Sequence, residues 1–253
     1  ISGKTLGVIG LGAIGVMVAN TAVDLGMNVV GYDPYLSVAG ALHLDNRVKT
    51  ADLDTLVKSA DFITVHVPLT PDTEKMFNAD TFAKMKDGAV LINNSRGELV
   101  DTGAVLAAVE SGKLERYITD FPSDELIGVP NVICVPHLGA STPEAEDNCA
   151  EMAAKELVDY IENGNITHSV NFPDVCAPRT TPARIAVMHN NVEGVISKVT
   201  SVISENGINI ANIIDKSKKD KAYMIVDLDA DVPEKVVKTI ESFDSVIRVR
   251  VFR

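Results

Sequence analysis

The sequence contains no tryptophan and only three cysteines, and aromatic residues make up 5% of its 253 residues. An odd number of cysteines with no CxxC spacing excludes a disulfide framework and a cysteine zinc site. No apolar run approaches the roughly 20 residues that are needed to cross a bilayer. The first residues, 1–4, also lack the charged start and apolar core of a signal peptide. We therefore expect a cytoplasmic protein with reduced thiols, no metal site and no membrane contact.

Positive charge is also scarce, because 23 Lys and Arg stand against 35 Asp and Glu, giving a formal net charge of −12. This balance argues against sequence-independent binding of nucleic acid, which needs a basic surface. The charge is unevenly distributed. Residues 1–181 hold 12 basic and 25 acidic side chains (net −13), whereas residues 182–253 hold 11 and 10 (net +1). This shift, next to Pro178 and Pro182, predicts a domain boundary near residue 180.

The first part of the chain alternates short apolar runs with helical or turn-rich stretches. Near-continuous apolar strands are typical of a parallel sheet whose two faces are both covered by helices. We therefore predict an α/β fold, a Rossmann-type doubly wound parallel sheet. Its strands are expected at residues 5–9, 27–32, 62–67, 89–93, 117–120 and 132–135.

A GxGxxG pattern follows the first expected strand and opens the first expected helix. In this context Gly10 permits a tight turn, Gly12 lets the main chain approach a pyrophosphate, and Gly15 lets helix and strand pack closely. Asp33 lies 18 residues beyond Gly15, at the tip of the second strand, where a carboxylate suits a ribose diol. Residues 34–37 supply no base for a 2′-phosphate. The pattern predicts NAD as cofactor, although Asp33 could also cap a turn.

Five segments resemble the NAD-binding domain of the D-isomer-specific 2-hydroxyacid dehydrogenases: GKTLGVIGLGAIG, GYDPY, DFITVHVPLT, GAVLINNSRGELVD and VPHLGAST. With the C-terminal segment described below, they resemble the branch of this family that oxidises D-3-phosphoglycerate in serine biosynthesis. Ala13 departs from many relatives, which have a longer polar or basic residue there. The resemblance places these residues at the cofactor: Gly10, Gly12, Ala13, Ile14, Gly15, Asp33, Val67, Pro68, Asn94, Ser95, Arg96, Asp120, His137, Gly139 and Ala140.

The resemblance also implies a catalytic arginine, histidine and acid. Arg96 would hold the substrate carboxylate with its guanidinium fork, and His137 would exchange a proton with the C2 hydroxyl. The acid would accept a hydrogen bond from His137 and fix its tautomer. Counting without gaps from residues 111–113 places this acid at Glu125, which we favour. Aligning on Phe121 places it at Asp124 instead.

Residues 182–253 show the order strand, helix, strand, strand, helix, strand, which predicts a ferredoxin-like βαββαβ unit. Its motifs resemble the ACT regulatory domain, which in the serine-pathway enzymes binds L-serine at a dimer interface. The resemblance carries over His189, Asn191 and Asn209 as effector residues. Asn191 could instead cap a helix, and Asn209 could belong to a turn. The resemblance implies a homodimer or homotetramer.

We therefore divide the chain into an NAD-binding domain at residues 1–140, a returning helix and linker at 141–181, and an ACT-like domain at 182–253. The helix, residues 141–164, carries an apolar stripe that we expect to be core. The linker region would be the remnant of a substrate domain, of which roughly 100 residues would precede residue 1. We expect this chain to bind NAD but to be inactive alone. Alternatives are a glyoxylate or hydroxypyruvate reductase, or a non-catalytic sensor of NAD and amino acids.

Overall fold

The computed structural model describes residues 1–253, except for the side chain of residue 39. Its contacts divide the chain into two compact units, Ile1–Gly139 and Ala140–Arg253. In the part of the chain that the structure describes, no helix has both the length and the apolar character needed to span a membrane.

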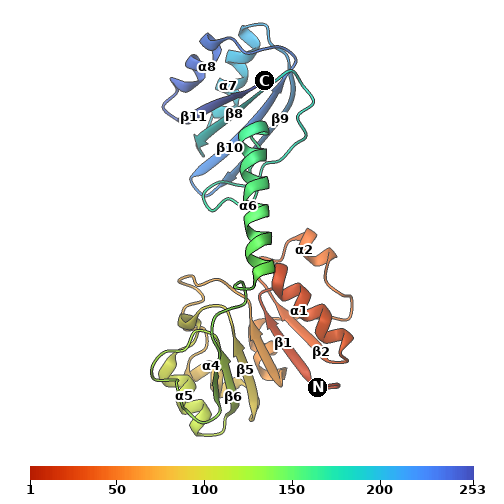
Figure 1. Cartoon of the computed structure of the whole chain (residues 1–253), viewed down its shortest axis with the longest axis vertical. Helices are drawn as coiled ribbons and strands as arrows, with labels where there is room; N and C mark the ends of the chain where they lie inside the picture. The colour runs from red at the N-terminus through yellow and green to blue at the C-terminus, as the bar shows by residue number, and fades with distance from the viewer. The chain divides into compact units, whose positions relative to one another are not determined.

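The first unit is built on a parallel seven-stranded sheet with the order β3-β2-β1-β4-β5-β6-β7 (Figure 1). This arrangement confirms the predicted doubly wound fold, and its strand order reverses between β1 and β4. The edge strand β3 was not predicted, because it consists of only two exposed residues. The strands are β1 (Thr5–Ile9), β2 (Asn28–Tyr32), β3 (Lys49–Thr50), β4 (Phe62–Val65), β5 (Ala89–Asn93), β6 (Leu114–Thr119) and β7 (Val132–Cys134).

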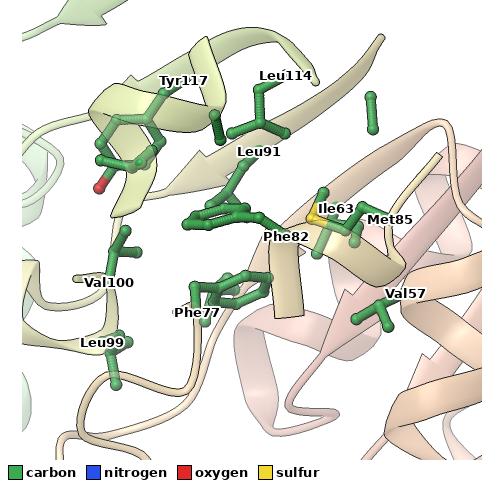
Figure 2. Packing of buried hydrophobic residues seen from close by; sticks show 14 of the residues in the cluster. Val57, Ile63, Phe77, Phe82, Met85, Leu91, Leu99, Val100, Leu114 and Tyr117 are labelled. Carbon is green, nitrogen blue, oxygen red and sulfur yellow. The ribbon is translucent and has the colours of Figure 1, made fainter. Parts of the chain in front are cut away.

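Helices cover both faces of this sheet. Helix α1 packs on one face through a small cluster that includes Val8, Val16 and Ala19. Helices α3, α4 and α5 pack on the opposite face, around a larger cluster that is shown in Figure 2. The helices of the first unit are α1 (Ala13–Asp24), α2 (Val38–Leu42), α3 (Leu53–Ser59), α4 (Ala79–Lys84), η1 (Gly97–Leu99) and α5 (Thr102–Glu110).

The carboxyl ends of the parallel strands lie in one row, and this row positions the candidate site. Ile9 of β1 is in register with both Tyr32 of β2 and Val65 of β4. The register continues from Val65 to Asn93 of β5, then to Thr119 of β6 and Cys134 of β7. The residues that follow each strand therefore emerge at the same edge, which is where ligands bind in open α/β sheets.

The second unit contains an antiparallel sheet of four strands in the order β11-β8-β10-β9. Helices α7 and α8 cover one face of this sheet, and the predicted ferredoxin-like unit is confirmed. On the other face, residues from the end of α6 and from the segment that follows it pack in a separate cluster. The elements are α6 (Pro143–Asn163), β8 (Ala183–Asn190), α7 (Val195–Glu205), β9 (Ile210–Lys218), β10 (Lys221–Leu228), α8 (Glu234–Glu241) and β11 (Val246–Phe252).

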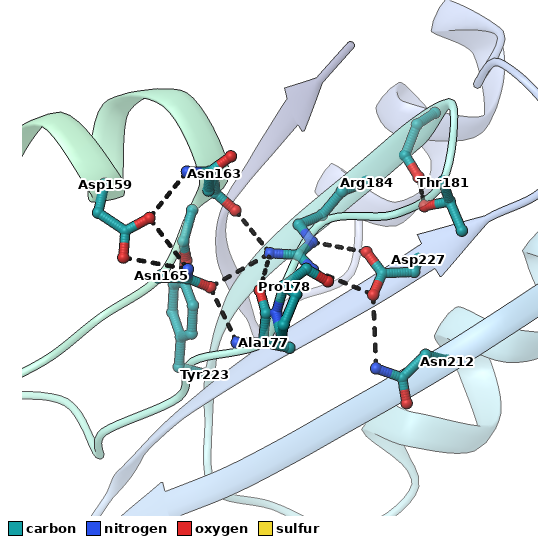
Figure 3. A network of polar contacts seen from close by, with 12 residues as sticks. Asp159, Asn163, Asn165, Ala177, Pro178, Thr181, Arg184, Asn212, Tyr223 and Asp227 are labelled. Carbon is teal, nitrogen blue, oxygen red and sulfur yellow. Dashed lines mark hydrogen bonds and ion pairs between the residues drawn. The ribbon is translucent and has the colours of Figure 1, made fainter.

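A buried arginine fixes the segment after α6 to the sheet (Figure 3). Arg184 of β8 has no solvent exposure and forms a two-point ion pair with Asp227 of β10, at 2.6 and 3.0 Å. Its remaining N–H groups donate to the carbonyl oxygens of Asn163, Ala177 and Pro178, and to Asn165 Oδ1. The guanidinium is fully satisfied, as a buried charge requires. The structure thus places this linker in the same unit as the sheet.

Helix α6 differs from its prediction in two respects. It begins at Pro143 rather than at residue 141, because Thr142 caps its N-terminus by accepting a hydrogen bond from the Ala145 amide. The apolar stripe that we expected to be core is largely exposed, since Met152 and Leu157 are 54% and 60% accessible. The amphipathic pattern predicts the helix correctly, but the described residues cover only the end of its apolar face.

Candidate active site and cofactor site

The glycine-rich loop between β1 and α1 has little room for side chains. Gly10 has φ +91°, and a Cβ there would lie 2.6 Å from the carbonyl oxygen of His66. A Cβ on Gly15 would lie 1.9 Å from the carbonyl oxygen of Gly10. Gly12 is different, because no described atom lies within 4 Å of its Cβ position. Gly10 and Gly15 are therefore required by the fold, whereas Gly12 leaves open space in front of the helix.

That open space lies at the start of a twelve-residue helix. The first amide groups of α1, from Ala13 and Ile14 onward, have no acceptor within the helix and carry the positive end of its dipole. Val67 lies against the loop, with its Cγ1 3.0 Å from the Cβ position at Gly10. The carbonyl oxygen of Pro68 accepts a hydrogen bond from Thr73 Oγ1 at 2.7 Å. This cradle fits the pyrophosphate of a dinucleotide.

Asp33 follows β2 and borders a cavity of about 530 Å³ whose lining also includes Gly12, Tyr35 and His43. Its two carboxylate oxygens accept hydrogen bonds from the backbone amides of Leu11 and Tyr35, at 2.9 and 2.8 Å. Each oxygen keeps a free acceptor position, since a carboxylate oxygen can accept two hydrogen bonds. The aspartate is therefore held beside the glycine loop and can still accept from a diol.

The loop after β5 positions Arg96. Asn93, which is fully buried, donates from Nδ2 to the Arg96 carbonyl oxygen at 2.8 Å and accepts from the Ser95 amide at 3.2 Å. Ser95 Oγ donates to the carbonyl oxygen of Val65 on β4 at 2.6 Å. Asn94 is exposed at the same turn, and the Arg96 side chain is also exposed. Two side chains therefore fix the backbone that carries the Arg96 guanidinium, which itself donates from Nη1 to the Ser95 carbonyl oxygen at 2.6 Å.

His137 and Asp120 form a close pair at the ends of β7 and β6. The distance from His137 Nδ1 to Asp120 Oδ2 is 2.7 Å, and the two side chains are 57% and 12% exposed. Since an ionised carboxylate only accepts, Nδ1 is the donor and Nε2 remains free. Asp120 Oδ1 is buried and has no hydrogen-bond partner in the described chain. A buried acceptor of this kind fits a donor from a bound ligand.

The predicted acids do not make this contact. Glu125 lies in the loop after β6 and accepts from Ser123 Oγ at 3.4 Å, and Asp124 is exposed beside it. The strand register explains the difference, because Thr119 pairs with Cys134 and so brings Asp120 to the same edge as His137. The structure thus gives Asp120, predicted only as a cofactor residue, the hydrogen bond expected of Glu125 or Asp124.

Phe121 contacts both candidate catalytic groups, which the sequence did not predict. Its ring centroid lies 4.4 Å from that of His137 and 5.5 Å from the guanidinium carbon of Arg96. An aromatic face attracts a guanidinium and packs against an imidazole. A phenylalanine after an expected strand is an ordinary core residue by sequence. The structure therefore brings Arg96, His137 and Asp120 together around one ring.

The expected effector residues lie at two ends of the second sheet. His189 pairs in register with Ala222, near the start of β10, and Asn191 Nδ2 donates to the Lys219 carbonyl oxygen at 3.0 Å. Asn209 bonds to the side chain of Asp229, beyond the other end of β10. The partners Ala222 and Asp229 are seven residues apart along the chain, which corresponds to about 23 Å in a strand. One protomer therefore does not bring Asn209 together with the other two residues. Helix α7 is capped by Gly194, not by Asn191.

Comparisons with known proteins agree with both units. Residues 1–139 match the family model described as D-isomer specific 2-hydroxyacid dehydrogenase, NAD binding domain. Residues 185–248 match the model described as AHAS small subunit-like ACT domain. Gly139 ends the first unit and Ala140 begins the second, so these two expected cofactor residues lie at the boundary.

Individual relatives support the same assignment. The chain is 35% identical to D-3-phosphoglycerate dehydrogenase 1 of Saccharomyces cerevisiae, over 95% of this chain and 55% of that protein. It spans 55–63% of the length of the curated relatives it matches first. An NAD-complexed D-isomer specific 2-hydroxyacid dehydrogenase from Lactobacillus delbrueckii ssp. bulgaricus matches 66% of this chain and 55% of its own, with a TM-score of 0.58 and 29% identity. A glyoxylate reductase from Paecilomyes thermophila matches 67% and 52%, with a TM-score of 0.61 and 30% identity.

Proposed function

Because this chain belongs to the D-isomer specific 2-hydroxyacid dehydrogenase family, we propose that it forms the cofactor-binding and regulatory part of an NAD-dependent dehydrogenase. The proposed reaction is the oxidation of D-3-phosphoglycerate to 3-phosphohydroxypyruvate, with L-serine as a feedback effector. The observation that carries this proposal is the His137–Asp120 pair, which lies beside Arg96 at the carboxyl edge of an NAD-binding sheet.

In the proposed reaction His137 is the proton acceptor. Asp120 accepts the Nδ1 proton and so fixes the tautomer in which Nε2 carries a free lone pair. Nε2 takes the proton of the substrate C2 hydroxyl as C2 becomes a carbonyl carbon, and returns it in the reverse direction. Asp120 also stabilises the imidazolium that forms. Asp120 replaces Glu125 and Asp124 in this role because of its contact with His137.

Arg96 is the proposed carboxylate-binding residue. Its guanidinium can hold a carboxylate with two parallel hydrogen bonds, which orients C2 toward His137. Phe121 packs against both groups. Asn93 and Ser95 keep the Arg96 backbone in place from the buried side. Orientation of the substrate is the contribution expected of such groups.

The residues that fit the cofactor are the loop Gly10–Gly15, the first amides of α1, and Asp33. When bound, NAD is the acceptor for the hydride that C2 loses. Asp33 favours NAD over NADP, because its carboxylate would repel a 2′-phosphate and residues 34–37 provide no compensating base. Ala13 has no polar side chain, so backbone amides and the helix dipole hold the phosphates.

The ACT domain supports an amino-acid effector, and His189, Asn191 and Asn209 are the proposed ligands of L-serine. Because one protomer separates Asn209 from the other two, the proposed site requires two copies of the chain, consistent with a homodimer or a larger oligomer. The ACT match also favours 3-phosphoglycerate over glyoxylate as substrate. A glyoxylate or hydroxypyruvate reductase remains the alternative within the family, because such enzymes share the NAD-binding domain.

The test is turnover by a form of this protein that is extended at its N-terminus to the length of its relatives. We expect NADH formation from D-3-phosphoglycerate, inhibited by L-serine. Equal turnover of hydroxypyruvate with NADH, without an effect of serine, would favour the reductase. Turnover of neither substrate, with NAD and serine still binding, would favour a sensor.

A further inference from the structure

The segment that connects α6 to the second sheet, residues 163–178, contains residues at which a chain commonly bends. Gly164 follows the last residue of α6 with φ +71°, and Pro178 and Pro182 precede β8. The sequence predicts a linker here, and hinges are a few residues at the ends of such elements. In the structure, however, both ends of this connecting segment are bound to the sheet.

The first end is bound through Gly164 and the last turn of α6. The Gly164 carbonyl oxygen accepts a hydrogen bond from the buried Tyr223 of β10, at 2.7 Å. A Cβ at Gly164 would lie 2.6 Å from the ring of Phe252 on β11. The guanidinium carbon of Arg250, also on β11, lies 4.6 Å from the ring centroid of Tyr160 in α6. Glycine is therefore needed here for close packing against the sheet as well as for its left-handed φ.

Arg184 of β8 binds both ends of the connecting segment (Figure 3). Its guanidinium donates to the carbonyl oxygen of Asn163 at one end, and to those of Ala177 and Pro178 at the other. Asp227 of β10 neutralises its charge, and Arg184 has no solvent exposure. If the segment moved away from the sheet, a buried charge and three carbonyl oxygens would lose hydrogen bonds, which is unfavourable in a buried site.

A buried amide connects α6 to the same network. Asn165 is 7% exposed, and its Nδ2 donates to the two carboxylate oxygens of Asp159 in α6, at 3.0 and 3.1 Å. Its Oδ1 accepts from the Ala177 amide at 3.1 Å and from Arg184 Nη1 at 3.2 Å. A tilt of α6 against the connecting segment would therefore break several hydrogen bonds of one buried side chain.

Helix α6 has no residue at which it would bend. Helices kink at proline, at glycine and serine pairs, or at bulges. In α6 proline occurs only at the first position, Pro143, and the helix contains neither glycine nor serine. Its 21 residues correspond to a length of about 31 Å. A rotation of about 10° at its sheet end would therefore move its first residue by about 5 Å.

We infer that α6 and the second sheet move as one rigid body, and that Arg184 is the residue that holds them together. A rotation of the sheet then reaches Pro143, which the chain places shortly after His137. The consequence for regulation rests on the proposed function. An effector that rotates the sheet would displace the chain next to the proposed catalytic histidine, because the connecting segment does not absorb the motion.

The first test needs no effector and uses the chain of 253 residues. One spin label is placed on Cys149, which is exposed on α6, and the other on Lys235→Cys, an exposed position of α8, which packs on the sheet. Cys134→Ser and Cys176→Ser remove the other thiols. We expect pulsed electron paramagnetic resonance to give a single narrow distribution of distances between the labels. A broad distribution in this background, or one with two maxima, would overturn the inference.

Variants in the same background test the role of Arg184. Arg184→Met with Asp227→Leu removes both buried charges, and Arg184→Lys keeps a charge but loses most of the donors. We expect each to broaden the distance distribution, the double variant by about twofold or more. Arg253→Met is the matched control, because it removes an exposed ion pair and should change nothing. An unchanged distribution in whichever of the two Arg184 variants folds would remove Arg184 from this role.

The consequence for regulation is tested in an N-terminally extended form. The double variant should bind L-serine with unchanged affinity by calorimetry, whereas the serine concentration needed for half inhibition should rise about 10-fold or more. Inhibition equal to that of wild type would contradict this consequence. If wild type bound no serine, the effector part of the proposed function would fail, and the distance distribution would still decide whether α6 and the sheet form one rigid body.

Discussion

Replacing Arg184 with methionine should remove much of the stability of the second unit. Arg184 is fully buried, and its loss leaves the Asp227 carboxylate without its partner. The carbonyl oxygens of Asn163, Ala177 and Pro178 lose their donor at the same time. Removing one partner of a buried ion pair costs about 3–5 kcal/mol, because a buried charge is left uncompensated. This is a large part of the roughly 5–15 kcal/mol that stabilises a typical domain.

Urea unfolding of the chain would measure this loss, with NAD binding as a separate probe of the first unit. We expect the transition of the second unit to lose about 3–5 kcal/mol while NAD affinity is unchanged. Arg253→Met is the matched control, since the Arg253–Asp231 pair is exposed and its loss should change the free energy of unfolding little. Combining Arg184→Met with Asp227→Leu should recover part of the loss. If the free energy of unfolding of Arg184→Met lay within about 1 kcal/mol of the wild-type value, the buried ion pair would not stabilise the second unit as argued.

Three further predictions concern the first unit. Asp33→Ala should narrow the preference for NAD over NADP, measured as the ratio of their dissociation constants; an unchanged ratio would remove Asp33 from cofactor selection. Gly12→Ala should leave the melting temperature unchanged, because the new Cβ meets open space. It should weaken NAD binding at least 10-fold, because that space is where the pyrophosphate would lie. Gly15→Ala should instead lower the melting temperature, because its Cβ would lie 1.9 Å from the Gly10 carbonyl oxygen. Asp120→Asn should lower kcat of an N-terminally extended form by on the order of 10²-fold or more. If Glu125→Gln lowered kcat and Asp120→Asn did not, Glu125 would be the acid that pairs with His137.

Much of the fold follows from local patterns in the sequence. Apolar strands that alternate with helices, and a glycine loop followed by Asp33, predict the parallel sheet, and the βαββαβ order predicts the second one. These signals are strong because they depend on hydrophobic periodicity and on turn chemistry within about 30 residues. The exposed faces of α6 and the two-residue strand β3 have no such signal.

The contacts within the candidate site could not be predicted in the same way. The partner of His137 depends on the register between β6 and β7, which places Asp120 rather than Glu125 at the sheet edge. Phe121 contacts Arg96 and His137, which lie on different elements, and its local sequence resembles ordinary core sequence. Such contacts are set by tertiary packing, which a single sequence does not reveal.

We propose that His137 exchanges a proton with a 2-hydroxyacid held at the carboxyl edge of this NAD-binding sheet. Steady-state kinetics of an N-terminally extended form, with D-3-phosphoglycerate and NAD, test it most directly. We expect His137→Gln to lower kcat by on the order of 10²–10⁴ while the dissociation constant of NAD stays within about twofold. An unchanged kcat in His137→Gln would contradict it.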